Sequence, residues 1–496
     1  MLLPLALSAC VSAPPPQYLN DHPANSTAAA APRSPPSQTL RSYRATASSV
    51  LAPIDTETPV EATAAPTSDP IHRLLQKELS VDTAVQIALL NNRDLQSSYA
   101  SLGIARADLM EAGLLDNPVI SYTYYAGSAG SIVEASIVQN FVSVFTLSAR
   151  KKVGQAAADR AVAETAQRVL DLAWQVRTQY YVVVGDAQAL ELMRQIVTAT
   201  DAAAELARRQ LAAGNLNRRD QAVQQAFYAQ ALLDASQAEI QLSSDREKLN
   251  RLMGLWGTQT RWSTPARLPR IPESLPSFDE IESQAISQRL DLAAAKKEAE
   301  GAAQALSLTQ QFRYLDALGI GVAYKHEPGG NNFVGPTVQL GLPIFNQGQA
   351  KVARMEAEYR RNQERVAALA VAIRSETREA RERLTAMQQI VQHYTQVMLP
   401  LQQTILSETL KSYNGMLTGV YELLLTKQMQ VQTARQYVAA NRDFWLAWAD
   451  LERAAGGSLA LVATRATEPR TDSPEPDDDA NHIEHDHEHN SGDKQP

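Results

Sequence analysis

The chain has 496 residues, of which 44% are hydrophobic, and a formal net charge of −8 at neutral pH. This is enough apolar material for a folded core, and the negative balance leaves no basic footprint, which argues against a DNA or RNA partner. A single cysteine excludes an internal disulfide, so Cys10 is either a lone thiol or an acyl acceptor.

The first residues have the pattern of a lipoprotein signal. Leu7-Ser8-Ala9 is a short apolar run that closes in small residues directly before Cys10, as in bacterial lipoproteins. Val11, and not aspartate, follows the cysteine, which predicts sorting to the outer membrane. We therefore expect residues 1–10 to be a signal that ends at a lipidated Cys10.

Two further segments have the composition of disordered chain. Residues 11–78 are rich in Pro, Ala, Ser and Thr, and we interpret them as an extended linker. Residues 458–496 form an acidic tail that carries four histidines, namely His482, His485, His487 and His489. Imidazole and carboxylate ligands suit Cu(II), Zn(II) or Ni(II), so the tail either captures metal or is simply a solubilising segment.

The chain between these segments repeats itself. Residues 88–95 are similar in sequence to residues 285–292, and residues 139–145 are similar to residues 339–345. Self-similarity at a fixed offset indicates a duplicated architecture. We expect a first repeat over 79–270 and a second over 271–457.

Each repeat should contain two long helices. Apolar residues recur every seven positions in the first repeat, at Val162, Val169, Val176, Val183, Leu190, Val197, Ala204 and Leu211. This seam predicts a coiled-coil helix over 147–213, which would be about 100 Å long. Gly214-Asn215 should end it, and a second helix should return over 218–253. The second repeat follows the same plan, with a turn at Gly415 and a kink expected at Pro400.

Each repeat should also contain one β-hairpin. The expected strands are 118–126 with 132–141, and 319–326 with 334–342. Apolar residues alternate with small or polar ones in the last strand, as lipid-facing and lumen-facing positions do in a membrane barrel. Strands of this length cross a bilayer when tilted, and no stretch is apolar and long enough for a membrane helix. A soluble hairpin packed on a helix is the alternative.

Four strands are too few to close a barrel. A closed barrel needs about eight strands, and open strand edges are not tolerated in hydrocarbon. The barrel would therefore be shared between chains, and closure alone permits either a dimer or a trimer.

Taken together, these features resemble the TolC-like outer-membrane efflux proteins, the exit ducts of tripartite pumps in Gram-negative bacteria. The resemblance covers most of 79–457 and depends on the Ala-Leu-x-Asn-Asn-x-x-Leu motif at 88–95, Leu-Gly-Leu-Pro-Ile-Phe at 340–345 and the turns at Gly214 and Gly415. It implies a mainly α fold with a membrane β-barrel. In that fold a homotrimer forms a twelve-stranded barrel in the outer membrane, which continues into a periplasmic α-helical barrel. It also implies an exit channel without cofactor, whose partners are a periplasmic adaptor and an inner-membrane transporter.

The resemblance also implies where adaptors dock and where the channel constricts. Both functions would belong to the two helical turns, formed by Gly214, Asn215, Leu216, Gly415, Met416 and Leu417, and to Asp220, six residues after Gly214. For Asp220, a solvated helical charge is the alternative. The position equivalent to Asp220 in the second repeat is the neutral Tyr421, so an acidic ring is not supported there. We expect any gating movement to come from the second hairpin.

An enzyme is not indicated, because the chain contains no phosphate-binding loop, no His-Glu-x-x-His and no nucleophile elbow. The surroundings of Pro400 and Tyr413 resemble the heavy-metal branch of this family, which, together with the histidine-containing tail, implies heavy-metal export, with drug or small-molecule export as the alternative. A periplasmic coiled-coil structural lipoprotein that never spans a membrane is the alternative of another class.

Overall fold

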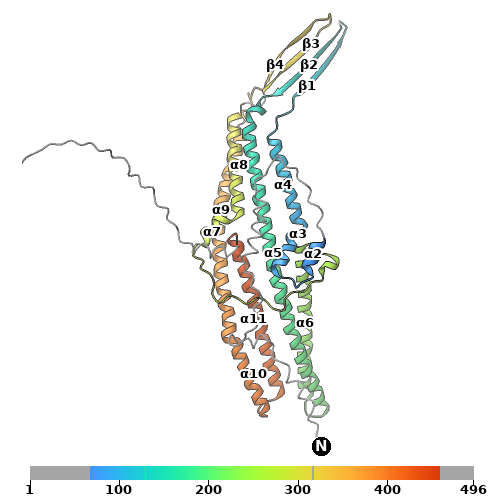
Figure 1. Cartoon of the computed structure of the whole chain (residues 1–496), viewed down its shortest axis with the longest axis vertical. Coiled ribbons are helices and arrows are strands. Elements are labelled where there is room, and N and C mark those ends of the chain that lie inside the picture. The colour runs from blue at the N-terminus through green and yellow to red at the C-terminus, as the bar shows by residue number, and fades with distance from the viewer. Residues whose placement is uncertain (1–67, 129, 315–317, 458–496) are drawn as a thin grey trace, which may run out of the picture.

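The structure, a computed structural model, describes residues 68–128, 130–314 and 318–457 (Figure 1). These segments form an elongated rod, with all strands at one end and the turns of the two longest helical hairpins at the other (Figure 1). Within the described segments, no helix is both long enough and apolar enough to cross a membrane.

The two repeats have the same order of elements. The first comprises α2 (Ser68–Leu75), α3 (Val81–Asn91), α4 (Arg93–Ala112), β1 (Val119–Gly127), β2 (Gly130–Asn140), α5 (Val142–Ala212), α6 (Arg218–Met253) and the 3-10 turn η2 (Gly257–Thr260). The second comprises α7 (Ile281–Gln288), α8 (Leu290–Phe312), β3 (Leu318–His326), β4 (Asn332–Leu340), α9 (Gln349–His393), the π-helical turn η3 (Tyr394–Met398), α10 (Leu399–Asn414) and α11 (Val420–Ala454). The predicted duplication of a strand hairpin and a helical hairpin is confirmed.

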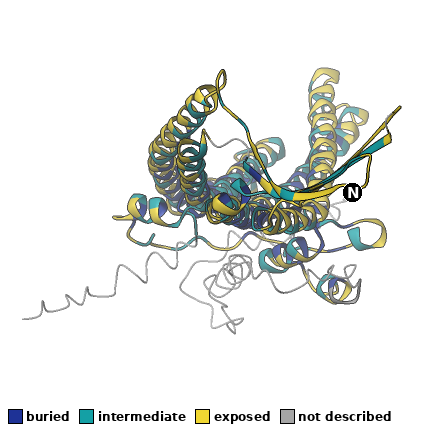
Figure 2. Ribbon diagram, turned by 90° about the horizontal axis from the view of Figure 1, so that it is seen from above, coloured by how far each residue is buried: buried dark blue, intermediate teal, exposed yellow. Residues whose placement is uncertain are grey.

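Helix α5 is the central element of the rod. It has 71 residues, so at 1.5 Å per residue it is about 100 Å long. The first five positions of the predicted seven-residue seam, from Val162 to Leu190, are buried. The helix packs against α3, α4, α6, α8 and α11. Seen from above, the buried residues lie where helices face one another (Figure 2). The core is therefore a set of helix–helix seams spread along the rod.

The duplicated motif at 88–95 joins the start of one helix to the end of another. Asn92 caps α4 by accepting a hydrogen bond from Leu95 N at 2.9 Å, and its Nδ2 donates to Leu252 O at 2.9 Å. Asn91 Nδ2 donates to Gly254 O at 2.7 Å. Carbonyl groups at a helix C-terminus have no partner within the helix, so these two asparagines complete the end of α6.

The second repeat makes the same junction with a different side chain. Arg289 occupies the cap position of α8, and its guanidinium binds Asp291 at 2.6 Å and Glu376 at 2.6 Å. Its backbone packs against Gly456, as that of Asn91 packs against Gly254. Both glycines have positive φ, at 74° and 67° respectively. The two repeats therefore conserve the geometry of this junction although its hydrogen-bonding groups differ.

The four strands form one antiparallel sheet in the order β1-β2-β3-β4. The β2–β3 pairing joins the two repeats, with Ile137 opposite Val322. Strands β1 and β4 are at the edges, and β4 contains Pro336, which lacks an N–H and is tolerated at an edge. The sheet of one chain is open.

The irregularity expected near Pro400 is a π-helical turn. Residues 394–398 form η3, and Pro400 lies in the first turn of α10. Proline cannot donate to the carbonyl four residues before it and its ring clashes with that group, so the helix widens just upstream. The second hairpin therefore has an interruption that α5 lacks.

The linker prediction is wrong at its C-terminal end. Residues 68–75, within the predicted linker 11–78, are helical, and Ile71 is 2% exposed within the core next to Leu79. Proline and small residues upstream dominated the composition and masked this short amphipathic helix.

Candidate functional site

The sheet has one apolar face that runs across all four strands. The register places Ile120 beside Ile137, and Ile137 beside Val322. The same face continues on β4 with Val334 and Val338, which pair with Tyr324 and Ile320. Most of these side chains are exposed within the single chain. An exposed apolar surface of this extent indicates contact with lipid or with another protein.

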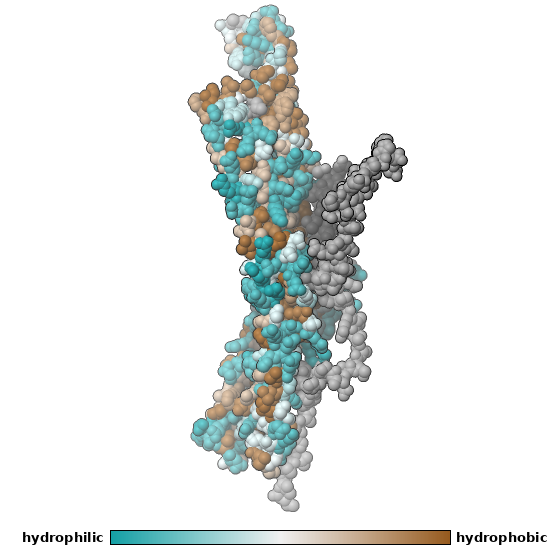
Figure 3. Space-filling view, turned by 90° about the vertical axis from the view of Figure 1, so that its left-hand side faces the viewer, coloured by the Kyte–Doolittle hydropathy of each residue, from teal (hydrophilic) through white to brown (hydrophobic). Residues whose placement is uncertain are grey.

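The central part of the opposite face is polar or small, whereas larger apolar residues such as Val119, Val138 and Phe333 lie toward its ends. Ser121 and Ser136 share a hydrogen bond of 2.7 Å, and Lys325 lies 3.6 Å from Glu134 on the neighbouring strand. Glycine and threonine occupy the corresponding positions of β4. This division is the one expected between the lipid-facing and lumen-facing sides of a membrane barrel. Figure 3 shows hydrophobic side chains on the strands and on the adjoining ends of the helices.

The first helical turn is closed by standard caps. Gly214 has a φ of 76°, and Asn215 N donates to Gln210 O at 2.8 Å, which completes the last carbonyls of α5. Asn217 starts α6, and its side chain accepts from Asp220 N at 2.8 Å and donates to Asp220 Oδ2 at 2.7 Å. The carboxylate of Asp220 is thus part of a reciprocal helix cap.

The second turn has the same hydrogen bonds with a different residue in the left-handed position. Met416 N donates to Tyr413 O at 3.0 Å and Leu417 N to Ser412 O at 2.8 Å. Gly415 has an ordinary φ of −79°, whereas Met416 has a φ of 59°. The expectation that Gly415 plays the part of Gly214 is therefore wrong, because the turn is shifted by one residue. A methionine in this region is strained, and such strain is concentrated at functional sites.

The two turns lie at the same end of the rod and are joined by a hydrogen bond. Tyr421 Oη donates to Gln210 Oε1 at 2.6 Å, linking the start of α11 to the end of α5. Partial burial, and secondly the negative charge of Asp220, raise the pKa of Tyr421, so it remains neutral. Met416 and Leu417 are 93% and 84% exposed. The end of the rod thus carries a polar link between hairpins and a projecting apolar pair.

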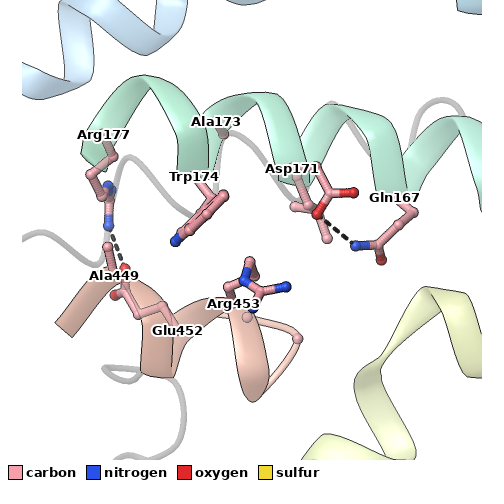
Figure 4. A pocket seen from close by; sticks show the side chains of 11 residues that line it. Gln167, Asp171, Ala173, Trp174, Arg177, Ala449, Glu452 and Arg453 are labelled. Atoms are coloured by element: carbon pink, nitrogen blue, oxygen red, sulfur yellow. Dashed lines mark hydrogen bonds and ion pairs between the residues drawn. The ribbon is translucent and has the colours of Figure 1, made fainter. Parts of the chain in front are cut away.

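A buried ion pair joins the repeats in the middle of the rod. Arg177 on α5 and Glu452 on α11 are both buried, and Nη1 of Arg177 lies 2.5 Å from Oε2 of Glu452 (Figure 4). Beside them Arg453 stacks 4.9 Å from the centre of the Trp174 ring. The adjoining cavity of about 60 Å³ is far smaller than small-molecule sites, so this region is a structural seam. Sequence reasoning missed the pair, because nothing local relates residues 275 positions apart.

The remaining predicted site residues lie outside the described residues. These are Cys10, His482, His485, His487 and His489. Among the described residues, no group of three or more His, Cys, Asp or Glu side chains is arranged to hold a metal ion.

Comparison with protein families identifies the first repeat. Residues 84–255 match the model of the outer membrane efflux protein family. This range begins in α3 and ends just after α6, so it contains the strand hairpin and the complete first helical hairpin. This part of the chain is therefore similar to outer membrane efflux proteins.

Solved channels have the same fold at low sequence identity. The outer membrane protein VceC of Vibrio cholerae is 16% identical, with a TM-score of 0.63 over 79% of this chain and 100% of its own. The CmeC outer membrane channel of Campylobacter jejuni is 12% identical, with a TM-score of 0.63 over 83% and 92%. The open MtrE outer membrane channel of Neisseria gonorrhoeae is 15% identical, with a TM-score of 0.60 over 76% and 89%. A sequence search among curated proteins finds no match.

The apolar face of the sheet predicts that the cost of adding a charge depends on the face to which it is added. Val338→Lys puts an ammonium group on the apolar face, which costs about 2–4 kcal/mol at the centre of a bilayer. Thr337→Lys adds the same group to the opposite face and is the matched control. We expect only Val338→Lys to reduce the amount of protein that resists urea extraction from outer membranes. Equal losses for both variants would contradict the assignment of the faces.

The buried ion pair predicts a large stability effect that a double substitution removes. Glu452→Ala leaves the Arg177 guanidinium buried without this carboxylate, which should lower the free energy of unfolding by about 3–5 kcal/mol. Replacing both residues, as in Arg177→Met with Glu452→Leu, should restore most of that stability. Thermal unfolding followed by circular dichroism measures both effects. A double variant as unstable as the single one would show that the pair is not the cause.

The hydrogen bond from Tyr421 to Gln210 predicts that the start of α11 opens more often when this bond is removed. Tyr421→Phe removes one hydrogen bond, worth about 1 kcal/mol, and should raise amide hydrogen exchange in the first turn of α11. Tyr413→Phe is the control, because it removes a different tyrosine hydroxyl group, at the end of α10. Unchanged exchange in Tyr421→Phe would indicate that the hairpins are held together elsewhere.

Proposed function

We propose that this protein is the exit duct of a tripartite efflux system, which carries substrates from the periplasm or from a pump to the outside of the cell. The main support is the continuous apolar face of the sheet, which lies at one end of the rod. The two joined helical turns lie at the opposite end. A lipid-facing sheet at one end and a docking tip at the other are what a duct requires. The family that residues 84–255 match is one of efflux channels, which supports a duct and not an enzyme.

The duct is assembled from several chains. Strands β1 and β4 leave their outer backbone groups unpaired within one chain, and such groups cost several kcal/mol each in hydrocarbon. Pairing β4 of one copy with β1 of the next removes both edges. Three copies give a twelve-stranded barrel, and the resemblance to TolC-like ducts favours this homotrimer over an eight-stranded dimer.

The helical turns are the contact with a periplasmic adaptor, and through it with an inner-membrane transporter. Support comes from Met416 and Leu417, since a strongly exposed apolar pair at the end of a rod suits a protein partner. Gly214, Asn215, Leu216 and Gly415 shape the two turns. Asp220 stabilises the start of α6. The second hairpin supplies the movement that opens the channel, because η3 interrupts the helix of that hairpin.

Lipidation at Cys10 anchors the N-terminus in the outer membrane, and the two repeats occupy 79–270 and 271–457. This proposal rests on the signal-like run before Cys10 and on the duplicated elements. The rest of the duct extends into the periplasm.

Heavy-metal cations such as copper are the proposed substrates, with drugs or other small molecules as the alternative. The support is the set of alternating histidines and acids between His482 and His489. If the tail captures metal, a strain that lacks residues 470–496 should become less tolerant of copper, zinc or nickel. If that strain and a strain without the whole gene both keep normal tolerance, metal is not the substrate.

Membrane extraction distinguishes the duct from a periplasmic coiled-coil lipoprotein. Cys10→Ser removes the acyl anchor, yet a duct should stay in the outer membrane through its barrel and run as a heat-modifiable oligomer. A structural lipoprotein would instead be released into the periplasmic fraction. Mass measurement of the native oligomer then decides between a trimer and a dimer.

A further inference from the structure

The strongest unexplained feature is a glycine in the middle of α5. Glycine disfavours helix interiors, yet Gly185 lies within a 71-residue helix. A Cβ at this position would be 3.1 Å from Cδ and 3.2 Å from Cβ of Arg442 on α11. Gly185 therefore lets the stem of Arg442 cross the helix closely, which brings its guanidinium to the next residue, Asp186.

Asp186 lies between two helices that belong to different repeats. On one side, Arg442 Nη1 of α11 is 3.5 Å from Asp186 Oδ1. On the other side, the carboxyl group of Asp245 of α6 is placed to act as a hydrogen-bond partner of Asp186. Two carboxyl groups can share a hydrogen bond only if one of them carries a proton. Below about pH 6, the crossing of α5, α6 and α11 can therefore hold a proton between these two carboxyl groups.

The surroundings of Asp245 decide which group carries that proton. Asp245 is 2% exposed and accepts hydrogen bonds from Lys248 Nζ at 2.8 Å, Gln241 Nε2 at 2.5 Å and Gln179 Nε2 at 3.1 Å. Burial opposes its ionisation, but these donors outweigh burial and lower the pKa of Asp245. The proton consequently resides on Asp186.

The charged groups around Asp186 come from both neighbouring helices. Asp245 and Lys248 face it from α6. Arg442 faces it from α11, and Asp443 holds that guanidinium through Nε at 3.0 Å and Nη2 at 2.9 Å. Burial, and then Asp245, raise the pKa of Asp186 to about 6 against the opposing charges of Arg442 and Lys248.

We propose that Asp186 is a proton-dependent link between the two helical hairpins. In its neutral form it donates to Asp245 and ties α5 to α6, and in its ionised form it pairs with Arg442 and ties α5 to α11. Ionisation thus transfers the link from within the first hairpin to the junction between the hairpins. A consequence for opening of the channel rests on the proposed function, but the link itself can be measured without transport.

The direction of the pH dependence follows from the raised pKa. The pKa of Asp186 is higher in the folded chain, at about 6, than the ordinary value of 3.8 for an aspartate. The stabilisation by the neutral form is therefore complete below about pH 3.8 and is lost as the pH rises through about 6. Over that range the bond to α6 weakens while the ion pair with Arg442 strengthens.

Hydrogen exchange of the purified full-length protein between pH 5 and 7.5 tests the link, with labelling times scaled for the chemical exchange rate. As the pH rises, exchange near Arg442 should slow by about threefold or more and exchange near Asp245 should accelerate. The midpoint of both changes should lie near pH 6.

Two variants and one control assign the effect to Asp186. Asp186→Asn keeps a donor toward Asp245 and should show the low-pH pattern at every pH. Asp245→Asn removes the neighbouring negative charge and should move the midpoint to lower pH. Glu191→Gln removes an exposed carboxylate from the same helix and should behave as wild type.

Specific outcomes would overturn the proposal. They are exchange near Arg442 and Asp245 that does not change with pH in the wild type, or a midpoint that persists in Asp186→Asn. If that variant does not fold, an unchanged midpoint in Asp245→Asn refutes the link equally. A failure of the duct proposal in membrane extraction would leave these exchange results unaffected.

Discussion

The pairing of β2 with β3 is the interaction on which the remainder of this structure depends. It joins strands 178 or more positions apart in sequence and turns two separate hairpins into one four-stranded sheet. Since hydrocarbon offers no hydrogen bonds, each internal pairing reduces the number of backbone groups that another chain must satisfy. Only the two outer edges, β1 and β4, remain for assembly.

The long helices are stabilised by seams and not by a compact core. Buried side chains of α5 face five other helices along its length, so stability is distributed along the rod. Two charged contacts lie within these apolar seams, namely the Arg177–Glu452 pair and the cluster around Asp186. Both join α5 to α11 and thus one repeat to the other. Charged contacts of this kind specify one register more sharply than sliding apolar surfaces do.

The repeats share their geometry but differ in their long helical arms and in the turns that follow these arms. The first helical arm is uninterrupted, whereas η3 and Pro400 break the second. The first turn has a glycine in the left-handed position, whereas the second holds Met416 there. The strained and interrupted arm is therefore the second one, and that this arm supplies the gating movement stays a prediction.

Much of the architecture was predictable from the chain alone, because it depends on local periodicity. The seven-residue seam from Val162 predicted helix α5 to within five residues at either end. The two hairpins were likewise predicted from local sequence pattern. The short helix at Ser68–Leu75 was missed, since its composition resembles the linker before it.

Tertiary structure decided the rest, because the relevant partners are far apart in sequence. The apolar face of the sheet became clear only with the register, which places weakly alternating strands side by side. The link from Tyr421 to Gln210, the cap around Asp220 and the shift from Gly415 to Met416 depend on backbone geometry at the turns. The contacts of Arg177 and Asp186 depend on how α11 crosses α5. Periodicity specifies which face of a helix is buried, but only packing specifies which charged side chain meets it there.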